Sequence, residues 1–176
     1  MLKKKVAIAA VFALSAVAAQ AQTYVDIGYG TAKYSETSLS MTPTIARGVI
    51  GQNLNDNFAV EFLGAVGAAN GTTSYSGAGI TLNISSITGA YITPKVKIGS
   101  AELFARAGVA RTTGTATVTG SRGSLTLNAD GTSPSFGGGV KFNLGNGSSI
   151  TADYMSYYSK DGIDVNGVTV SYGFSF

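Results

Sequence analysis

The chain contains no histidine and no cysteine among its 176 residues. Without them, the Ser–His and Cys–His routes to nucleophilic catalysis are closed, zinc lacks its usual ligands, and no disulfide can form. No metal-ligating set or cofactor-binding motif is evident. Acidic pairs such as Glu61 and Glu102 are better explained by ion pairing than by acid–base chemistry. The sequence therefore predicts a protein that is not an enzyme and needs no cofactor.

Charge is also scarce, since only 12% of the residues are Asp, Glu, Lys or Arg. The 12 basic residues outnumber the 9 acidic ones, but the excess equals the three lysines at positions 3 to 5. The rest of the chain is balanced. Because the positive charge belongs to the terminal segment, no nucleic-acid partner is predicted.

Long hydrophobic runs are absent except at the start, where Val6–Ala19 follows the three lysines. This run is shorter than the roughly 20 residues of a membrane-spanning helix. Ala19-Gln20-Ala21 has the small-x-small pattern of a cleavage site, so the segment is typical of a secretory signal peptide, with an uncleaved anchor as the alternative. We predict a signal peptide over residues 1–21 and one mature domain over residues 22–176.

The chain is rich in segments where apolar and polar side chains alternate with a period of two residues, the pattern of β-strands. In the final segment, Val168–Phe176, the apolar face ends in Tyr172, Phe174 and Phe176. Eight such segments are predicted as strands: Thr23–Tyr34, Thr42–Gln52, Phe58–Ala69, Ile80–Ile98, Glu102–Thr113, Ser135–Leu144, Ser149–Lys160 and Gly167–Phe176. In Ile80–Ile98, the even positions form one charge-free face throughout.

Short and long connections alternate between these strands. The short turns are Asn53–Asn57, Gly99–Ala101 and Gly145–Ser148, and the longer connections are Ser35–Met41, Asn70–Gly79, Gly114–Pro134 and Asp161–Asn166. This layout predicts an all-β fold, an eight-stranded antiparallel up-and-down transmembrane β-barrel of the bacterial outer membrane. Gly114–Pro134 is predicted to be a hairpin projecting beyond the membrane, with a ten-stranded barrel as the alternative.

Nine charged residues fall on the polar faces of these strands: Asp26, Arg47, Glu61, Lys95, Lys97, Glu102, Arg106, Lys141 and Asp153. A Lys or Arg facing lipid at the bilayer midplane costs about 2–4 kcal/mol, so we predict that these charges line the lumen. Four carboxylates and five cations indicate a cross-strand ion-pair network, with solvation by lumenal water as the alternative. Because an eight-stranded barrel is about wide enough to be filled by side chains, the lumen is predicted to be plugged.

A resemblance to a known family is carried by four stretches: Asn55–Glu61, Leu103–Ala110, Asp153-Tyr154 and Val170–Phe176. They are similar to the small barrels related to the transmembrane domain of outer membrane protein A. The resemblance implies export to the outer membrane of a Gram-negative bacterium, among its lipid and lipopolysaccharide. It also implies recognition by the barrel-assembly machinery, which reads a terminal aromatic residue on an alternating strand. Tyr172, Phe174 and Phe176 match that signal.

Two functions are open to such a barrel. In the first, the barrel is an anchor with a structural or surface-interaction role, and Asn70–Gly79 and Gly114–Pro134 contact an unknown extracellular ligand or other envelope components. In the second, the barrel is a narrow porin-like channel for ions or small solutes. We favour the first and expect a monomer.

Overall fold

The computed structural model describes residues 22–176 except 38, 76 and 122, and the regular structure of these residues consists of eleven β-strands. They are β1 (Thr23–Thr31), β2 (Lys33–Glu36), β3 (Leu39–Met41), β4 (Thr44–Asn53), β5 (Phe58–Ala69), β6 (Gly71–Tyr75), β7 (Ala78–Ile98), β8 (Ala101–Gly120), β9 (Gly123–Gly145), β10 (Ser148–Lys160) and β11 (Ile163–Ser175). The predicted signal peptide lies outside the described residues. No helix in the described ranges could cross a membrane.

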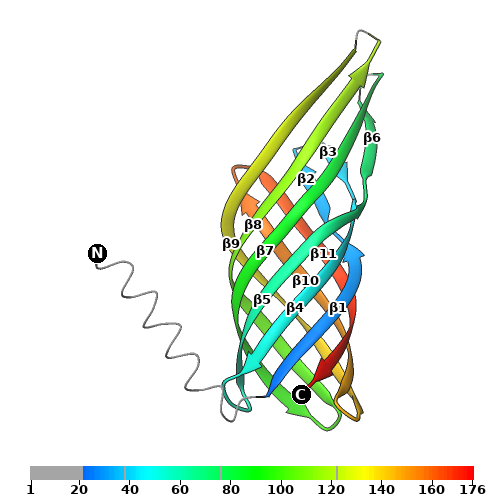
Figure 1. Cartoon of the computed structure of the whole chain (residues 1–176). Coiled ribbons are helices and arrows are strands. Elements are labelled where there is room, and N and C mark those ends of the chain that lie inside the picture. The colour runs from blue at the N-terminus through cyan, green and yellow to red at the C-terminus, as the bar shows by residue number, and fades with distance from the viewer. Residues whose placement is uncertain (1–21, 38, 76, 122) are drawn as a thin grey trace, which may run out of the picture.

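Eight of the strands form a closed antiparallel barrel. Strands β1, β4, β5, β7, β8, β9, β10 and β11 pair in that order, and β11 pairs back to β1 (Figure 1). Ile27 on β1, for example, lies opposite Gly48 on β4 and Tyr172 on β11. Closure gives every barrel strand two partners, so no open sheet edge meets the lipid. The predicted eight-stranded up-and-down barrel is confirmed.

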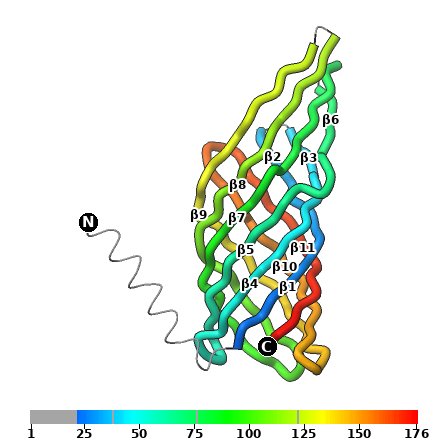
Figure 2. Tube along the Cα trace, in the orientation of Figure 1, coloured from blue at the N-terminus to red at the C-terminus, as the bar shows by residue number. Residues whose placement is uncertain are grey.

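The connections at the two ends of the barrel differ greatly in length. Tight turns at residues 54–57, 99–100 and 146–147 lie at the same end as both termini of the barrel (Figure 1). At the other end the strands continue beyond the barrel, and β7, β8 and β9 rise furthest (Figure 2). Because outer-membrane barrels have short periplasmic turns and long extracellular connections, the extended end is extracellular.

Most of the connections predicted as loops are strands. The predicted loop Ser35–Met41 contains the end of β2 and all of β3, Asn70–Gly79 contains β6, and Asp161–Asn166 contains the start of β11. The predicted hairpin at Gly114–Pro134 is confirmed. Strands β8 and β9 pair in one unbroken register, from Ala101 opposite Phe142 at the base to Gly120 opposite Gly123 at the tip. The ten-stranded alternative is excluded, since this hairpin continues β8 and β9 without adding strands to the barrel.

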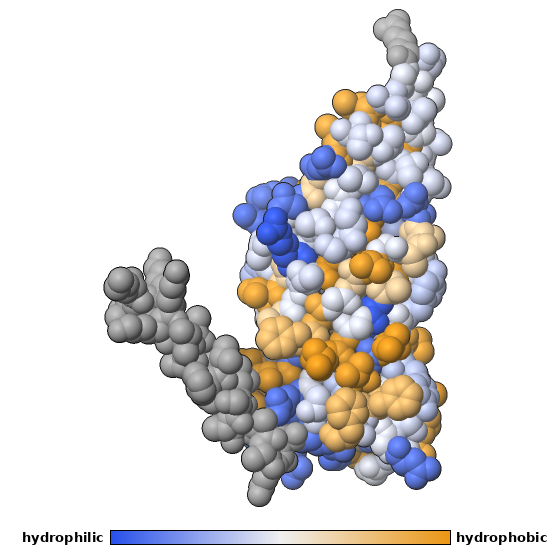
Figure 3. Space-filling view, in the orientation of Figure 1, coloured by the Kyte–Doolittle hydropathy of each residue, from blue (hydrophilic) through white to orange (hydrophobic). Residues whose placement is uncertain are grey.

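Apolar side chains cover the outside of the barrel. Ile27, Phe62 and Val170 are 65%, 60% and 60% exposed, whereas Asp26 and Arg47 are 2% and 3% exposed. Figure 3 shows hydrophobic residues gathered over the lower part of the barrel and more hydrophilic ones above it. This inside-out distribution is that of a barrel whose outer surface is solvated by lipid.

The prediction that the even positions of Ile80–Ile98 all lie on one face is wrong. Leu82 and Ile84 point into the barrel and are 7% and 3% exposed, whereas Ile92 points outward and is 59% exposed. The pairing of β7 with β8 shifts between Ile84 and Ser86, which leaves Ser85 as an extra residue. Such a bulge inverts which positions face inward, because the side-chain period is two.

The barrel interior is divided into a charged half and an apolar half. On β10, Asp153 is followed toward the extracellular end by Met155 and Tyr157, both 0% exposed. On β4, Ile45 lies on the extracellular side of Arg47 and is also fully buried. The prediction of a polar interior therefore holds for the periplasmic half, while the extracellular half is packed with apolar side chains.

Candidate functional site

The centre of the charged half is a guanidinium–carboxylate pair that crosses the lumen. Nη1 of Arg47 on β4 lies 2.7 Å from Oδ1 of Asp153 on β10, and Nη2 lies 2.5 Å from Oδ2. Nη1 also donates to the hydroxyl of Tyr157 at 3.2 Å. The side chains of Arg47 and Asp153 are 1% and 0% exposed. This bidentate geometry is the strongest form of carboxylate recognition by arginine.

A second arginine extends the pair into a chain of charges. Arg106 on β8 donates from Nη1 to Oδ2 of Asp153 at 2.8 Å and from Nε to Glu61 on β5. The hydroxyl of Tyr24 on β1 donates to the same Glu61. Arg47, Asp153, Arg106 and Glu61 thus form a central ion-pair cluster with two positive and two negative charges.

Two further pairs lie outside the cluster. Nζ of Lys141 is 3.2 Å from Oδ2 of Asp26 and lies 4.0 Å from the centre of the Tyr24 ring. Nζ of Lys95 is 3.3 Å from Oε2 of Glu102 and donates to Asn53 at 2.7 Å. Of the nine predicted lumenal charges, eight are brought together in these contacts.

Lys97 differs from the other eight. It is an exposed residue near the periplasmic end of β7, and the described residues include no carboxylate in an ion pair with it. The prediction that Lys97 lines the lumen is wrong, because its side chain is exposed. Glu102, its cross-strand neighbour, pairs with Lys95 instead.

The cluster explains how charges are kept inside the barrel. Removing a charge from water costs several kcal/mol, and only well-oriented opposite charges and hydrogen bonds offset that cost. Here each guanidinium has a carboxylate partner, and the four charges sum to zero. The contacts join β1, β4, β5, β8 and β10 across the lumen, so they link opposite walls of the barrel.

Three aromatic residues that contact the central ion-pair cluster are not among the predicted lumenal residues. Tyr24 donates to Glu61, Tyr157 accepts from Arg47, and Phe104 lies under the guanidinium of Arg106 at 4.5 Å. Each has the same parity along its strand as a predicted lumenal charge, namely Asp26, Asp153 and Arg106. Parity was therefore the signal that could have identified them.

On the extracellular side, the ends of β6, β7, β8 and β9 form an open sheet. Strand β9 pairs with β8 along its full length but pairs with β10 only from Phe136 onward. Within the described part of the chain, residues 124–134 thus have a partner strand on one side only. Residues 123–130 are all exposed. Ser133 is buried and accepts a hydrogen bond from the amide of Ser159 on β10, so we call residues 124–130 the free edge of β9.

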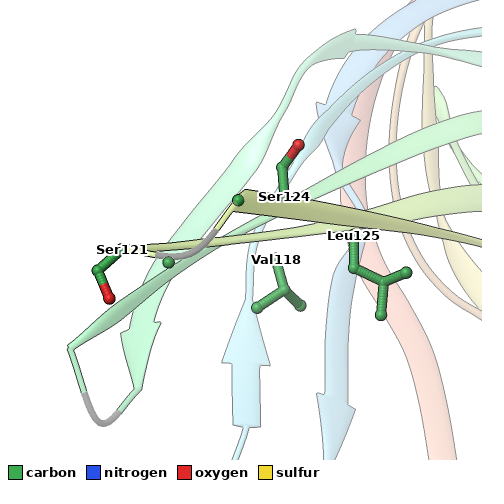
Figure 4. A pocket seen from close by; sticks show the side chains of 6 residues that line it. Val118, Ser121, Ser124 and Leu125 are labelled. Carbon is green, nitrogen blue, oxygen red and sulfur yellow. The ribbon is translucent and has the colours of Figure 1, made fainter.

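The tip of this sheet has one apolar and one polar side. Val118 on β8 and Leu125 on β9 are directly paired and point to the same side, whereas Ser124 points away from it (Figure 4). These residues line a shallow hollow of about 420 Å³ beside Gly120 and Gly123. The opposite side carries hydroxyls, with Thr117 and Thr126 in contact at 3.2 Å.

Sequence comparison agrees with this architecture. A family model described as "Outer membrane protein beta-barrel domain" matches residues 6–176, nearly the whole chain. The chain belongs to this outer-membrane β-barrel family. Its place is accordingly the outer membrane of a Gram-negative bacterium. No curated protein matches the chain in sequence.

Solved structures show the same fold at low identity. The attachment invasion locus protein Ail of Yersinia pestis, in complex with the heparin analogue sucrose octasulfate, aligns with a TM-score of 0.63 at 17% identity, covering 89% of this chain and 99% of that chain. The N-terminal β-barrel domain of OprF from Pseudomonas aeruginosa gives 0.57 at 15%, covering 89% and 100%. OprG from Pseudomonas aeruginosa gives 0.56 at 11%, covering 88% and 95%.

In this family barrel, the terminal aromatics lie on the seam that closes the cylinder. The amide of Phe176 donates to the carbonyl of Thr23 at 2.9 Å, and the amide of Thr23 donates back at 3.1 Å. Tyr172 and Phe174 point outward, with ring centres 4.9 Å apart in an edge-to-face arrangement. The three aromatics are thus on the outer surface, beside the seam between β1 and β11.

Proposed function

We propose that this barrel is a non-enzymatic anchor for a surface-interaction site, with a lumen closed to solutes. The interaction site is the sheet that β6 to β9 raise above the membrane, and the observation that carries the proposal is the free edge of β9. An edge strand presents a row of unpaired backbone donors and acceptors, so it is a template for another strand. The partner is then a protein with an extended segment, bound by β-strand addition.

The composition of the free edge favours such pairing. Soluble and surface proteins protect long edges with charged residues, prolines or bulges. Residues 124–129 read Ser-Leu-Thr-Leu-Asn-Ala, without a charge or a proline. Leu125 and Leu127 are 60% and 54% exposed. Alternating apolar side chains on one face would give the added strand its specificity.

The relatives are consistent with a role at the cell surface. Ail is named for attachment and invasion and was solved with a heparin analogue. The name of a protein with the same fold supports a surface role, but function resides in sites carried by a fold and not in the fold itself. The lumenal ion pairs support the closed-lumen part of the proposal, because Arg47, Arg106, Glu61 and Asp153 connect opposite walls.

Shortening the extension tests the interaction site. Ala116 and Leu127 are directly paired, so residues 117–126 can be replaced by a two-residue Asn-Gly turn without changing the register below. We expect adhesion of expressing cells to one another and to matrix-coated surfaces to fall at least tenfold, with unchanged amounts of folded barrel. The double variant Thr126→Lys with Asn128→Lys, which charges the free edge, should reproduce the loss.

A matched control uses the neighbouring strand. Thr117 and Thr115 lie opposite Thr126 and Asn128, but β8 has a partner on both sides there. Lysines at these two positions add the same charge away from the edge and should leave adhesion intact. If the shortened and edge-charged proteins adhered as well as the parent, the proposed site would be wrong.

Planar-bilayer recording tests the closed lumen. Refolded protein, shown to be folded by heat-modifiable gel migration, is expected to give no steady conductance comparable to that of a large porin. The physical reason is the row of buried ion pairs across the charged half. A persistent ion flux that changed on neutralising Arg106 or Lys95 would instead support a channel.

A further inference from the structure

An apolar cavity of about 380 Å³ lies in the extracellular mouth of the barrel. Its wall combines the upper parts of β7, β8 and β9 with β2, β3 and the start of β11. Leu82, Ile84, Leu127, Val165 and Met41 are among the residues that line it. A volume of this order falls within the range of small-molecule sites, which are mostly apolar with a few polar groups.

The cavity is closed below and open above. Ile84 and Val165 belong both to its lining and to the buried apolar cluster that continues down to Ile87 and Met155. That cluster separates the cavity from the central ion-pair cluster. Toward the outside, the lining continues through Val118 and Leu127 onto the apolar side of the hairpin, where Leu125 is 60% exposed. An apolar strip thus leads from the hairpin tip into the barrel.

The polar groups of the lining include one carboxylate, Glu36, that has no ion-pair partner among the described residues. Glu36 lines the cavity and accepts a hydrogen bond from the hydroxyl of Tyr34, and the described ion pairs include none to Glu36. Burial and the adjoining carboxylate raise the pKa of Tyr34, so this hydroxyl stays protonated. Asp130, the second carboxylate in the lining, contacts Arg111 at 2.8 Å on the exposed surface.

We propose that this cavity binds a single linear alkyl chain that carries a cationic or uncharged head group. The chain fills the aliphatic pocket between β7 and β11, and the head group remains at the rim beside Glu36. An anionic head group is disfavoured by the Glu36 carboxylate, whereas the charge of Asp130 is balanced by Arg111. Burial of the chain removes apolar surface from water, which favours binding.

Photolabelling separates the cavity from the surrounding lipid. Folded protein in lipid nanodiscs is incubated with a long-chain alkylamine that bears a diazirine near its end, and labelled residues are mapped by mass spectrometry. We expect labelling at Leu82 and Ile84 inside the mouth. Labelling at Phe62 and Phe136, which face outward, reports partition into the bilayer and serves as the internal standard.

A cavity-filling variant provides the specific test. Ala116 lines the cavity, so Ala116→Phe should reduce interior labelling at least fivefold without changing the internal standard. The matched control is Thr117→Phe, which adds the same ring on the opposite side of β8. In the parent protein, excess unlabelled alkylamine should compete at Leu82 and Ile84 but not at Phe62, which tests the site without any substitution.

Two outcomes would overturn the proposal. Labelling confined to outward-facing residues, or interior labelling insensitive to both Ala116→Phe and competition, would show that no chain enters the mouth. Equal interior labelling by a diazirine fatty acid of the same length would refute the head-group preference. Neither outcome would affect the proposed adhesion role, because that role depends on the free edge of β9.

Discussion

Replacing Asp153 by asparagine is expected to destabilise the folded barrel by about 3–5 kcal/mol, the range found when one partner of a buried ion pair is removed. The side chain is 0% exposed, and its two oxygens contact both Arg47 and Arg106. Asparagine keeps the size but not the charge. Arg106 would retain Glu61, whereas Arg47 would lose its carboxylate partner and remain buried.

The measurement is urea-induced unfolding in detergent, with the folded fraction determined from gel mobility without heating. The matched control is Asp130→Asn on β9. Asp130 pairs with Arg111 at the same 2.8 Å separation that joins Arg106 to Asp153, but both side chains of the Asp130–Arg111 pair are 61% exposed. Exposed pairs contribute about 0–1 kcal/mol. Equal effects of the two substitutions would mean that the central ion-pair cluster is no more important than a surface contact.

The strands and their lipid-facing sides could be predicted because one local rule governs both. Alternation with period two fixes which residues share a face, and lipid then decides which face is outside. Ile27 beside Asp26 and Phe62 beside Glu61 follow this rule, with the apolar side chain outside and the charged one inside. The lumenal position of eight charged residues follows from the same parity, although which carboxylate meets which cation depends on the barrel's circumference and stagger.

Register shifts lie outside the reach of that rule. The bulge between Ile84 and Ser86 places Leu82 and Ile84 inside, although Ile92, at the same parity along the strand, faces outward. A bulge depends on the partner strand as much as on its own residues. For this reason the apolar half of the interior, and the cavity above it, could not be predicted from alternation.

The strand content of the long extracellular connections could not be predicted for a related reason. Their Ser, Thr and Gly content is typical of loops, yet Thr-rich stretches also form strands when a neighbour supplies the ladder. Thr72 on β6 pairs with Thr81 on β7, and Thr117 on β8 pairs with Thr126 on β9. Strand pairing begun within the barrel therefore continues above the membrane and produces the free edge.

The two halves of the interior support separate roles. The charged half links opposite walls through buried ion pairs, which supports the proposed closed lumen. The apolar half forms the floor of the cavity in the extracellular mouth. Both proposed sites, the free edge of β9 and the alkyl-chain cavity, therefore lie on the extracellular side.

The glycines of the inner wall lead to the second large effect. A Cβ atom added to Gly108 on β8 would lie 2.0 Å from the carbonyl oxygen of Ala90 and 2.9 Å from Cα of Tyr91 on β7. These are backbone atoms, so a rotamer change cannot relieve the overlap. Gly108→Ala is therefore expected to cost at least the roughly 1–3 kcal/mol of overpacking. Strands β7 and β8 would have to move apart at a point where their backbone hydrogen-bond ladder is continuous.

Gly64 on β5 provides the matched control, because a Cβ atom there meets nothing within 4 Å and would face the lipid. Gly64→Ala should leave the urea midpoint unchanged or raise it, since alanine restricts the unfolded chain more than glycine does. Parallel unfolding curves measure the difference directly. If Gly108→Ala and Gly64→Ala gave the same midpoint, close backbone approach could not be what requires glycine inside the wall, and the tightness of the barrel would have to be reconsidered.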